Sequence, residues 1–263
     1  MKKHVKLLFL AACSASLFGG CNKKDAEKTE INVFAAASMT ETLNQIKAKY
    51  EEANKDIKVN LNLDSSGTLK TQIENGADCD LFISAAPKQM NQLQDLNLVN
   101  TDSRINLLEN KVALATSQAN PKNVLGFDDM ATRLVSDPNF ILGMGNADVP
   151  VGQYTQQILQ HYSLVEADLA AAGKISYGNN VKAVTTLVAN EGVACGVIYQ
   201  TDAFSANLHV IETATTELCG QVIYPAALMK NAKQAEKANK FFDYLKGSEA
   251  KAIFESVGFS RIA

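Results

Sequence analysis

The sequence contains few of the residues from which metal sites and nucleophilic active sites are built. It has five cysteines and three histidines in 263 residues, and no C-x-x-C spacing occurs. Zinc sites need clustered cysteine and histidine ligands, and catalytic cysteines need a histidine partner, so we expect neither. The G-x-S-x-G turn of serine hydrolases is also absent, and Ser248-x-x-Lys251 lacks the companion motifs of penicillin-recognising enzymes. These absences argue against an enzyme and against a bound cofactor or metal cation.

The sequence also lacks an apolar run long and uninterrupted enough to favour a membrane-spanning helix. It begins with "MKKHVKLLFLAACSASLFGGC", in which lysines precede a short apolar stretch and small residues lead to Cys21. This pattern is typical of an export signal that ends at a lipid-attachment cysteine. We therefore predict a signal peptide over 1–20, lipidation at Cys21 and a polar tether over 21–29, which together anchor an extracytoplasmic protein to the cell membrane. Cleavage before Cys13, and a plain secretory signal that leaves the protein free in the periplasm, remain alternatives.

Basic residues are in the minority once the predicted signal peptide is removed. Residues 1–20 hold three of the 25 lysines and arginines and none of the 28 acidic residues, so 22 basic residues face 28 acidic ones, a net charge of −6. Nucleic-acid binding depends largely on neutralising phosphates, so no nucleic-acid partner is expected. If the ligand is an anion, local geometry must bind it against the overall charge of the protein.

Apolar runs typical of strands alternate with short amphipathic helical patterns from residue 30 onward. This alternation predicts an α/β fold with largely parallel strands, and no repeat or low-complexity segment interrupts it. Outside the cytoplasm Cys195 and Cys219 could form a disulfide, which their spacing alone leaves open. The strands are predicted over 31–36, 57–63, 80–84, 111–116, 140–144, 174–177, 195–199, 208–211 and 221–228.

Four segments share one design, an apolar strand, a short loop of small or hydroxyl residues, and a helix start. They are "VFAAASMTE", "LNLDSSGTLKTQI", "ILGMGNADVPVGQYTQQIL" and "ISYGNNVKAVTTL". In open α/β sheets ligands bind beyond the carboxyl ends of the strands, where the unpaired N–H groups and positive dipole ends of helices favour an anion. Serine adds an O–H donor, and no lysine or arginine lies within the four loops themselves. The pattern therefore predicts a site for a fully ionised oxyanion held by neutral donors.

Each of these positions also has a purely structural interpretation. Ser38 followed by Glu41 fits the S-x-x-E capping box, which needs no ligand. "SSGT" alone is an ordinary turn and helix cap. Tyr199 alone would be a half-buried strand aromatic, with Asp202 capping the segment that follows. Only the joint pattern favours a binding site over four separate helix starts.

Six segments together resemble the substrate-binding protein of bacterial molybdate ABC transporters, and the resemblance covers residues 31–261 in order. It implies a two-lobed type II periplasmic-binding-protein fold, each lobe a mostly parallel sheet flanked by helices, with the ligand in the interlobe cleft. Residues 30–111 and 222–263 would form the first lobe and residues 112–221 the second. The segments are "VFAAASMTETL", "SSGTLKTQIENGADCDLFISAA", "ADVPVGQYTQQIL", "NNVKAVTTLV", "GVIYQTDA" and "FFDYLKGSEAKAIFESVGF".

The resemblance also implies a ligand and a partner. A tetrahedral oxyanion, molybdate or tungstate, would be bound by hydroxyls and backbone amides and delivered by a monomer to an ABC permease in the membrane. Three departures leave the fine selectivity open, because Val151 stands where alanine is common, Asn180 where an acid is common and Gly67 where serine or asparagine is common. A receptor for another solute, a regulatory domain of the same shape and an enzyme remain the alternatives. The ligand-binding residues implied are Ser38, Ser66, Val151, Val181 and Tyr199.

Overall fold

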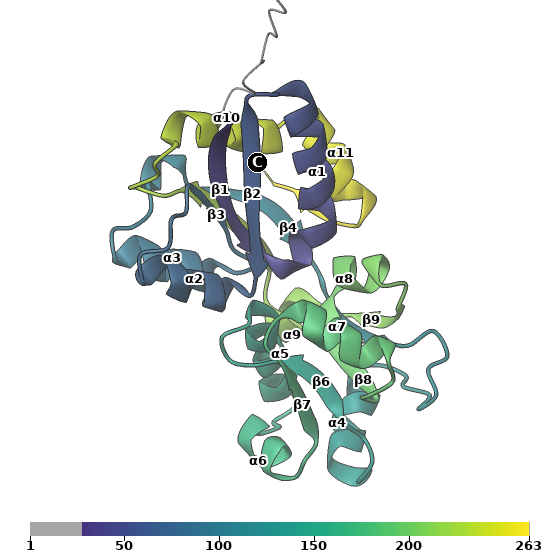
Figure 1. Cartoon of the computed structure of the whole chain (residues 1–263). Helices are drawn as coiled ribbons and strands as arrows, with labels where there is room; N and C mark the ends of the chain where they lie inside the picture. Colours follow the sequence, from purple (N-terminus) through teal and green to yellow (C-terminus); the bar gives the residue numbers. More distant parts are fainter. Residues whose placement is uncertain (1–27, 263) are drawn as a thin grey trace, which may run out of the picture.

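The computed structural model describes residues 28–262, which fold into two lobes, each built on its own sheet (Figure 1). The first sheet has the strand order β11-β4-β10-β3-β1-β2, and the second has the order β7-β6-β8-β5-β9. The first comprises β1 (Thr29–Ala36), β2 (Ile57–Asp64), β3 (Leu81–Ile83), β4 (Ile105–Asn110), β10 (Val222–Leu228) and β11 (Ser260–Arg261). The second comprises β5 (Val112–Thr116), β6 (Leu142–Gly145), β7 (Ile175–Gly178), β8 (Cys195–Tyr199) and β9 (His209–Thr213).

Alternating side chains let helices cover both faces of the first sheet. On β1, Val33 packs into the core beneath α1, whereas its neighbour Phe34 packs into a separate cluster with residues of α2 and α3. Successive residues of a strand point to opposite faces, so one strand supplies both cores. The helices of this lobe are α1 (Thr40–Ala53), α2 (Ser66–Glu74), α3 (Pro87–Asp95), α10 (Ala235–Leu245) and α11 (Ser248–Ser256), with short 3-10 turns η1 (Ala37–Met39) and η2 (Thr101–Ser103).

The second lobe packs one helix unusually close to its sheet. Gly143 on β6 and Gly196 on β8 lie beneath Val184 and Val188 of α7, and a side chain at Gly196 would collide with Val188. The two glycines therefore set how near the start of α7 comes to the strand ends. The helices of this lobe are α4 (Phe127–Ser136), α5 (Pro150–His161), α6 (Glu166–Ala171), α7 (Val181–Ala189), α8 (Gln200–Ser205) and α9 (Thr216–Cys219).

The α/β class and the two-lobed architecture are confirmed, and most strands of each sheet share one direction, although several neighbouring pairs are antiparallel. β1 pairs in parallel with β2 and β3, and β6 with β7 and β8. β10 runs antiparallel to β3 and β4, β11 to β4, and β5 to β8 and β9. The antiparallel pairs of β5 and β10 arise because the chain enters each sheet from the other lobe in an extended strand that runs against the β-α-β units of that sheet.

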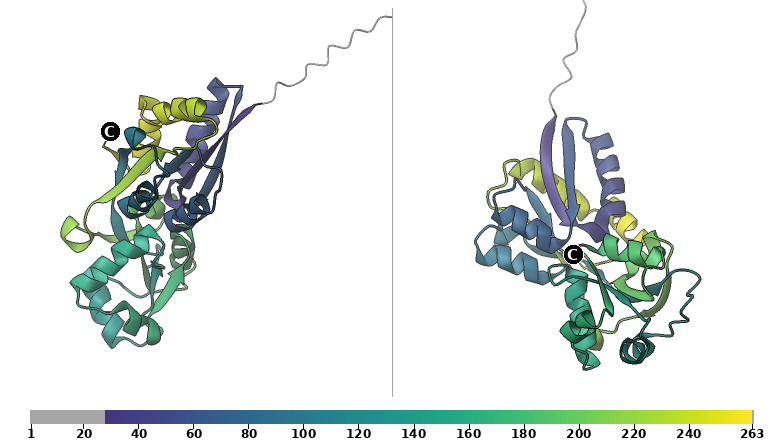
Figure 2. Two further views of the ribbon diagram at one scale, coloured as in Figure 1. Left: turned by 90° about the vertical axis from the view of Figure 1, so that its left-hand side faces the viewer. Right: turned by 60° about the horizontal axis from the view of Figure 1, so that its bottom comes forward.

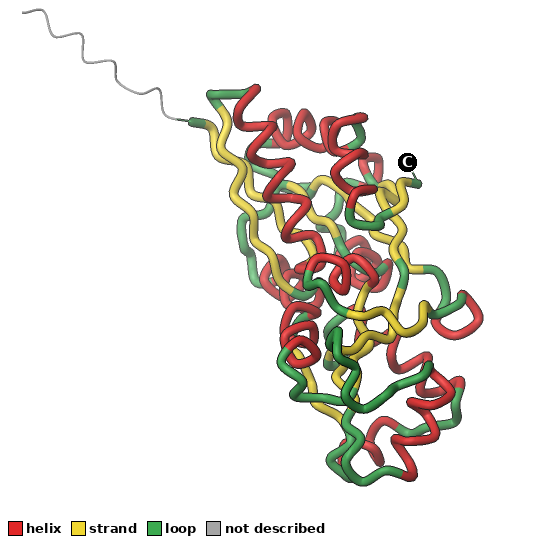
Figure 3. Tube along the Cα trace, turned by 90° about the vertical axis from the view of Figure 1, so that its right-hand side faces the viewer, coloured by secondary structure: helices red, strands yellow, loops and turns green. Residues whose placement is uncertain are grey.

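The chain crosses between the lobes twice. The first crossing runs from β4 to β5 with Lys111 alone between them, and the second runs from β9 through α9 to β10. Figure 2 shows that the second lobe is one continuous stretch, in teal and green, whereas the first combines purple and blue segments with yellow ones. Figure 3 shows the strands of both lobes flanked by helices.

Cys79, Cys195 and Cys219 are buried free thiols, so Cys195 and Cys219 do not form the disulfide left open by the sequence. The predicted signal peptide, Cys13, Cys21 and most of the tether lie outside the described residues. Within residues 28–262, no helix has the length and apolar character needed to cross a membrane.

Candidate anion site between the lobes

Helix starts from both lobes face one small cavity of about 10 Å³, which we call the interlobe cavity. It contains all five residues predicted to bind the ligand, two from the first lobe and three from the second. Asp64 and Ala85 also belong to its wall and were missed, although both lie in or beside segments that carry the resemblance. Its lining is Ala36, Ala37, Ser38, Asp64, Ser65, Ser66, Ala85, Val149, Pro150, Val151, Val181 and Tyr199.

Ser38 lies inside the 3-10 turn that joins β1 to α1, and its hydroxyl is 2.8 Å from the hydroxyl of Tyr224. The capping-box interpretation is wrong. Helix α1 begins at Thr40 with Met39 at its N-cap and has no side-chain cap, while the Glu41 carboxylate reaches the ammonium of Lys182. The extra turn between strand and helix moves Ser38 away from the amides that it would cap and leaves it on the cavity wall.

The two serines of "SSGT" have different tasks. Ser65 is the N-cap of α2, and its hydroxyl accepts a hydrogen bond from the Thr68 amide at 3.1 Å. Ser66 is the first residue of the helix and fully buried, and its Oγ accepts a hydrogen bond from the Ala85 amide at 2.9 Å. A serine hydroxyl carries one hydrogen. Because the Ser66 oxygen already accepts, its hydrogen is left to be donated.

The second lobe presents two helix N-termini to the cavity. Val151 follows Pro150 at the start of α5, and Val181 is the first residue of α7, where the Asn180 side chain accepts from the Ala183 amide at 3.0 Å. The first four N–H groups of a helix have no partner within the helix. The amides of Val151 and Val181 therefore add two uncharged donors at positive dipole ends, a geometry that favours anions.

Tyr199 ends β8 and is 1% exposed, so it is not the half-buried aromatic of the structural interpretation. Its hydroxyl donates to the carbonyl oxygen of Ala85 in the other lobe, a long hydrogen bond of 3.5 Å that a bound anion would have to replace. Burial raises the pKa of Tyr199 well above its ordinary value. The phenol therefore stays protonated and remains a donor.

A buried ion pair adjoins the site and also connects the two lobes. The Lys182 ammonium lies 3.0 Å from Asp202 in its own lobe and 2.7 Å from Glu41 in the other. Asp202 is fully buried inside α8 rather than capping it, and within residues 28–262 no well-formed hydrogen bond reaches either of its carboxylate oxygens. Burial raises the pKa of Asp202 to about 6, against the opposing effect of Lys182. We call Lys182, Glu41 and Asp202 the ionic latch.

Burial also disfavours the charged form of Lys182, but Asp202 and Glu41 outweigh it and raise the pKa of this lysine. Its ammonium is therefore held charged between two carboxylates. Beside it, the Asn180 amide donates to the Asp64 carboxylate across the lobes at 3.0 Å. Neither lysine nor arginine appears in the described lining of the interlobe cavity.

Gly67 allows the lobes to approach each other closely. A Cβ atom at this position, in the first turn of α2, would overlap with the carbonyl oxygen of Asp148 in the second lobe. The sequence suggested only that Gly67 removes a hydroxyl that a serine would supply. In the structure, its lack of a side chain is what permits this contact between the two backbones.

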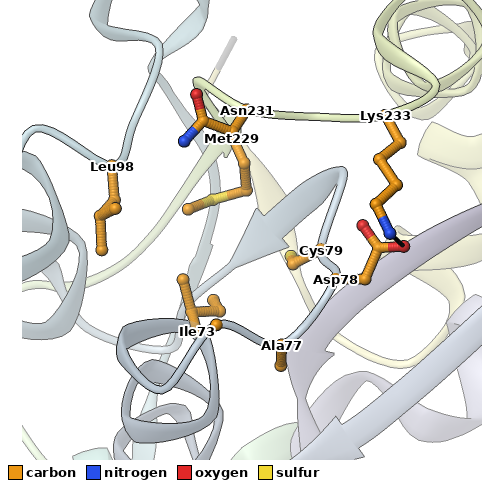
Figure 4. A pocket seen from close by; sticks show the side chains of 9 residues that line it. Ile73, Ala77, Asp78, Cys79, Leu98, Met229, Asn231 and Lys233 are labelled. Atoms are coloured by element: carbon orange, nitrogen blue, oxygen red, sulfur yellow. Dashed lines mark ion pairs between the residues drawn. The ribbon is translucent and has the colours of Figure 1, made fainter.

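A larger hollow of about 260 Å³ lies in the first lobe, away from the helix starts (Figure 4). Ile73, Cys79 and Met229 form an apolar wall, and an Asp78–Lys233 ion pair of 2.8 Å stands at its rim. It lacks converging donors from two lobes. In the part of the chain that the structure describes, no cluster of three histidine, cysteine or acidic side chains is arranged to hold a metal ion.

The comparisons with known proteins agree with this geometry. The profile of the family described as bacterial extracellular solute-binding protein matches residues 31–260. YvgL of Bacillus subtilis, provisionally named an ABC transporter substrate-binding lipoprotein, is 30% identical over 260 residues, which cover 96% of this chain and 97% of YvgL. The molybdate-binding protein ModA of Escherichia coli is 31% identical over 258 residues, covering 97% and 98% of the two chains. The structure of the periplasmic molybdate-binding protein of Azotobacter vinelandii aligns with a TM-score of 0.76 at 21% identity, covering 89% of this chain and all of that one, which shows the shared fold.

Proposed function

Because the chain belongs to the family of bacterial extracellular solute-binding proteins, we propose that it is the substrate-binding component of an ABC importer for molybdate and tungstate. A member of this family binds a solute rather than converting it, so no enzymatic role is assigned. The relationship to a molybdate-binding protein over nearly the whole chain supports the choice of ligand. The observation that carries the proposal is the convergence of uncharged donors from both lobes on one cavity.

Five donors are enough for useful affinity. They are the hydroxyls of Ser38, Ser66 and Tyr199 and the amides of Val151 and Val181. A hydrogen bond to a charged group contributes about 1.5 to 3 kcal/mol, and micromolar binding needs about 8 kcal/mol. Four such bonds reach this value, so the site does not need a lysine or arginine to bind a dianion.

Binding is proposed to close the lobes. Residues 30–111 and 222–263 contribute Ser38 and Ser66, and residues 112–221 contribute the other three donors. An anion that contacts both lobes favours the closed arrangement by its greater affinity for that arrangement. The closed monomer would then deliver the anion to the permease.

The proposed location is the outer face of the cell membrane, with lipid attached at Cys21. The signal-like N-terminus and the relationship to YvgL support this location. A tether over residues 21–29 would join the lipid to β1, whose first residue is Thr29. Lipidation at Cys13 and a free periplasmic form are the alternatives.

Selectivity is proposed to come from size and protonation. Molybdate and tungstate have similar radii and the same charge, so fixed donors should bind both. Sulfate is smaller and would leave some donors too distant, losing hydrogen bonds that water had supplied. Phosphate retains a proton near neutral pH. Asp64 is the one carboxylate in the described lining of the cavity, and its Oδ1 atom already accepts from the Ser65 amide and from Asn180.

Titration calorimetry of the purified chain with molybdate, tungstate, sulfate and phosphate tests the proposal. We expect heat and tight binding with the first two and weak or no binding with the others. A thermal shift series should give the same order, because a ligand that binds the folded state raises its apparent stability. Sulfate or phosphate binding as tightly as molybdate would make the protein a receptor for another oxyanion, and no response to any of the four would refute oxyanion binding.

A further inference from the structure

A chain of buried hydrogen bonds runs from Ser38 into both crossings between the lobes. The Ser38 Oγ lies 2.8 Å from the Tyr224 hydroxyl, and the Asn110 amide nitrogen donates to the same hydroxyl at 3.2 Å. That nitrogen also donates to Thr201 at 2.9 Å. All four side chains are at most 5% exposed. Of these four residues only Ser38 belongs to the described lining of the interlobe cavity, so the other three can affect a bound ligand only indirectly.

The chain of hydrogen bonds follows the route by which the lobes are connected. Asn110 is the last residue of β4 at the first crossing, and Tyr224 lies on β10 at the second. The two strands are neighbours, with Val222 paired to Asn110 and a register shift directly after Tyr224. Thr201 lies in α8 of the second lobe. The hydrogen bonds therefore link the second lobe, both crossings and Ser38.

The direction of each bond follows from the available hydrogens. The Asn110 carbonyl oxygen accepts from the Lys111 amide at 2.8 Å, which fixes the orientation of the side chain and leaves both hydrogens of its nitrogen for Thr201 and Tyr224. The Tyr224 oxygen thus accepts from Asn110. Either hydroxyl can donate in the bond between Tyr224 and Ser38, and with Asn110 on the Tyr224 oxygen we assign the hydrogen of that bond to Tyr224. In this arrangement Ser38 accepts from Tyr224, and its own hydrogen remains available for the cavity.

We propose that Tyr224 and Asn110 are positioning residues that hold the Ser38 hydroxyl as a donor to the bound oxyanion. This inference rests on the proposed function. In this arrangement the Ser38 oxygen accepts a hydrogen bond from the protein, as the Ser66 oxygen does from the Ala85 amide. The hydrogen of each serine is then left for the anion. Without the Tyr224 hydroxyl, the Ser38 hydrogen would be free to turn to neighbouring acceptors, and the anion would lose a pre-oriented partner.

Tyr224→Phe is the first test, because it keeps the ring that packs edge-on against Tyr199 and Phe259 and removes only the hydroxyl. We expect the Kd for molybdate, measured by calorimetry, to rise about tenfold. Tyr244→Phe is the matched control. It removes a hydroxyl of the same lobe that bonds to Glu249 at the surface, and its Kd should stay within twofold of the unchanged protein.

A double-mutant cycle separates positioning from general damage. If Tyr224 acts through Ser38, Tyr224→Phe should change the Kd less than twofold in a Ser38→Ala background and still about tenfold in a Ser66→Ala background. A merely structural loss would weaken binding equally in both backgrounds. Equal effects would overturn the inference, as would an unchanged Kd in Tyr224→Phe alone.

Asn110→Asp reverses the chain without changing its shape. The carboxylate accepts where the amide donated, so the Tyr224 hydrogen would turn to residue 110 and Ser38 would donate to Tyr224 instead of to the anion. We expect weaker binding in this variant, again with little further loss in the Ser38→Ala background. Repulsion between the added negative charge and the anion should persist in that background, so only a loss that persists in full would contradict the proposed direction of the bonds. Thermal unfolding without ligand checks that each variant is folded.

The outcome also distinguishes this inference from the proposed function. If the unchanged protein binds none of the four oxyanions, the proposed function fails and the positioning role fails with it. If it binds sulfate or phosphate best, the same cycle is measured with that anion. If it binds molybdate but the cycle shows no dependence on Ser38, only the positioning role is overturned.

Discussion

At the scale of single residues, the hydrogen bonds that each serine hydroxyl already makes determine what it can offer to a ligand in the interlobe cavity. Ser66 accepts from a backbone amide, and Ser65, its neighbour, accepts from the amide that it caps. Of these two hydroxyls, only that of Ser66 does not cap the helix, so its hydrogen is available to the cavity. Two adjacent serines with the same side chain thus have separate hydrogen-bonding partners, and we expect one to act in binding and the other in helix stability.

Alanine substitutions should separate these roles. Ser38→Ala and Ser66→Ala should each raise the Kd for molybdate ten- to hundredfold, because each removes a hydrogen bond to a charged ligand worth about 1.5 to 3 kcal/mol. Ser65→Ala is the control, since it removes the cap of α2 and should lower the free energy of unfolding by about 1 kcal/mol with a small effect on Kd. Calorimetry and urea unfolding measure the two quantities. Unchanged affinity in both binding variants would contradict the assigned donors.

Asp202 should make stability depend on pH in an unusual direction. Its pKa is about 6 in the folded protein, above the usual value near 4, so between about pH 4 and pH 6 the folded state binds more protons than the unfolded state. The contribution of Asp202 to the free energy of unfolding is therefore present below about pH 4 and lost as pH rises to about 6. The loss is at most about 3 kcal/mol for a shift of this size.

The measurement compares the unchanged protein with Asp202→Asn by urea unfolding at several pH values. As pH rises from 4 to 6, the free energy of unfolding of the unchanged protein should fall relative to that of Asp202→Asn. Above pH 7 the difference between the two should stay constant. Surface carboxylates such as Glu30 and Asp56 have lowered pKa values and occur in both proteins, so they cancel in the difference. Parallel curves would show that Asp202 titrates normally.

At the scale of secondary-structure elements, the contact between the start of α2 and the loop before α5 depends on Gly67. Gly67→Ala should raise the Kd for molybdate about tenfold, because its methyl group overlaps with the Asp148 carbonyl oxygen and keeps the lobes apart. The free energy of unfolding of the ligand-free protein should not fall, since alanine within a helix is more favourable than glycine by about 0.5 to 1 kcal/mol.

Gly192→Ala is the control for this substitution. A Cβ atom at this position would lie 3.5 Å from the Leu187 carbonyl oxygen, an ordinary contact distance, and Gly192 follows the end of α7 opposite to the one that lines the cavity. Affinity should be unchanged in this variant. If Gly67→Ala also binds molybdate as tightly as the unchanged protein, the close approach is not needed for binding.

The elements themselves could be predicted better than their arrangement. Apolar runs gave strands such as β8, predicted over 195–199 and observed as Cys195–Tyr199. Local pattern does not determine strand direction, because β10 runs antiparallel to β3 only as a result of where the chain crosses between the lobes. The capping box failed for a related reason. Glu41 is near Ser38 in sequence, but its partner Lys182 lies 141 residues away.

The five residues predicted to bind the ligand could be named from sequence because each belongs to a recognisable motif, and the structure shows that they line one cavity. Asn110 and Tyr224 carry no such motif. Asn110 ends β4, over which no strand was predicted, and Tyr224 has the alternating pattern of any buried strand residue. Their significance depends on hydrogen bonds between positions 114 and 186 residues apart, which no local pattern reveals.

At the scale of the whole molecule, the ionic latch should stabilise the closed arrangement of the lobes slightly. Glu41→Gln removes the contact of Lys182 with the first lobe and leaves its pair with Asp202. Because the Glu41 side chain is 42% exposed, the pair should be worth at most about 1 kcal/mol. We expect a two- to fivefold rise in the Kd for molybdate at low salt and a smaller rise at 0.5 M salt, measured by calorimetry.

Glu52→Gln is the control for the latch, because it removes an equal charge from an exposed position of the same helix. Its effect on the Kd should be small or favourable, since loss of a negative charge reduces repulsion of the anion. Tighter binding in both variants would show that net charge, and not the contact between the lobes, determines their effect.

The division of the first lobe between distant parts of the chain has a consequence for biogenesis. Strands β3 and β4 both pair with β10, and the Tyr50 ring of α1 packs against Phe241 of α10 at 4.9 Å. A polypeptide delivered N-terminus first acquires every strand of the second lobe before it acquires β10. The second lobe can therefore fold early, whereas the edge of β3 that pairs with β10 stays unpaired until β10 has been delivered. This edge is where a chaperone would have to protect the nascent protein against aggregation.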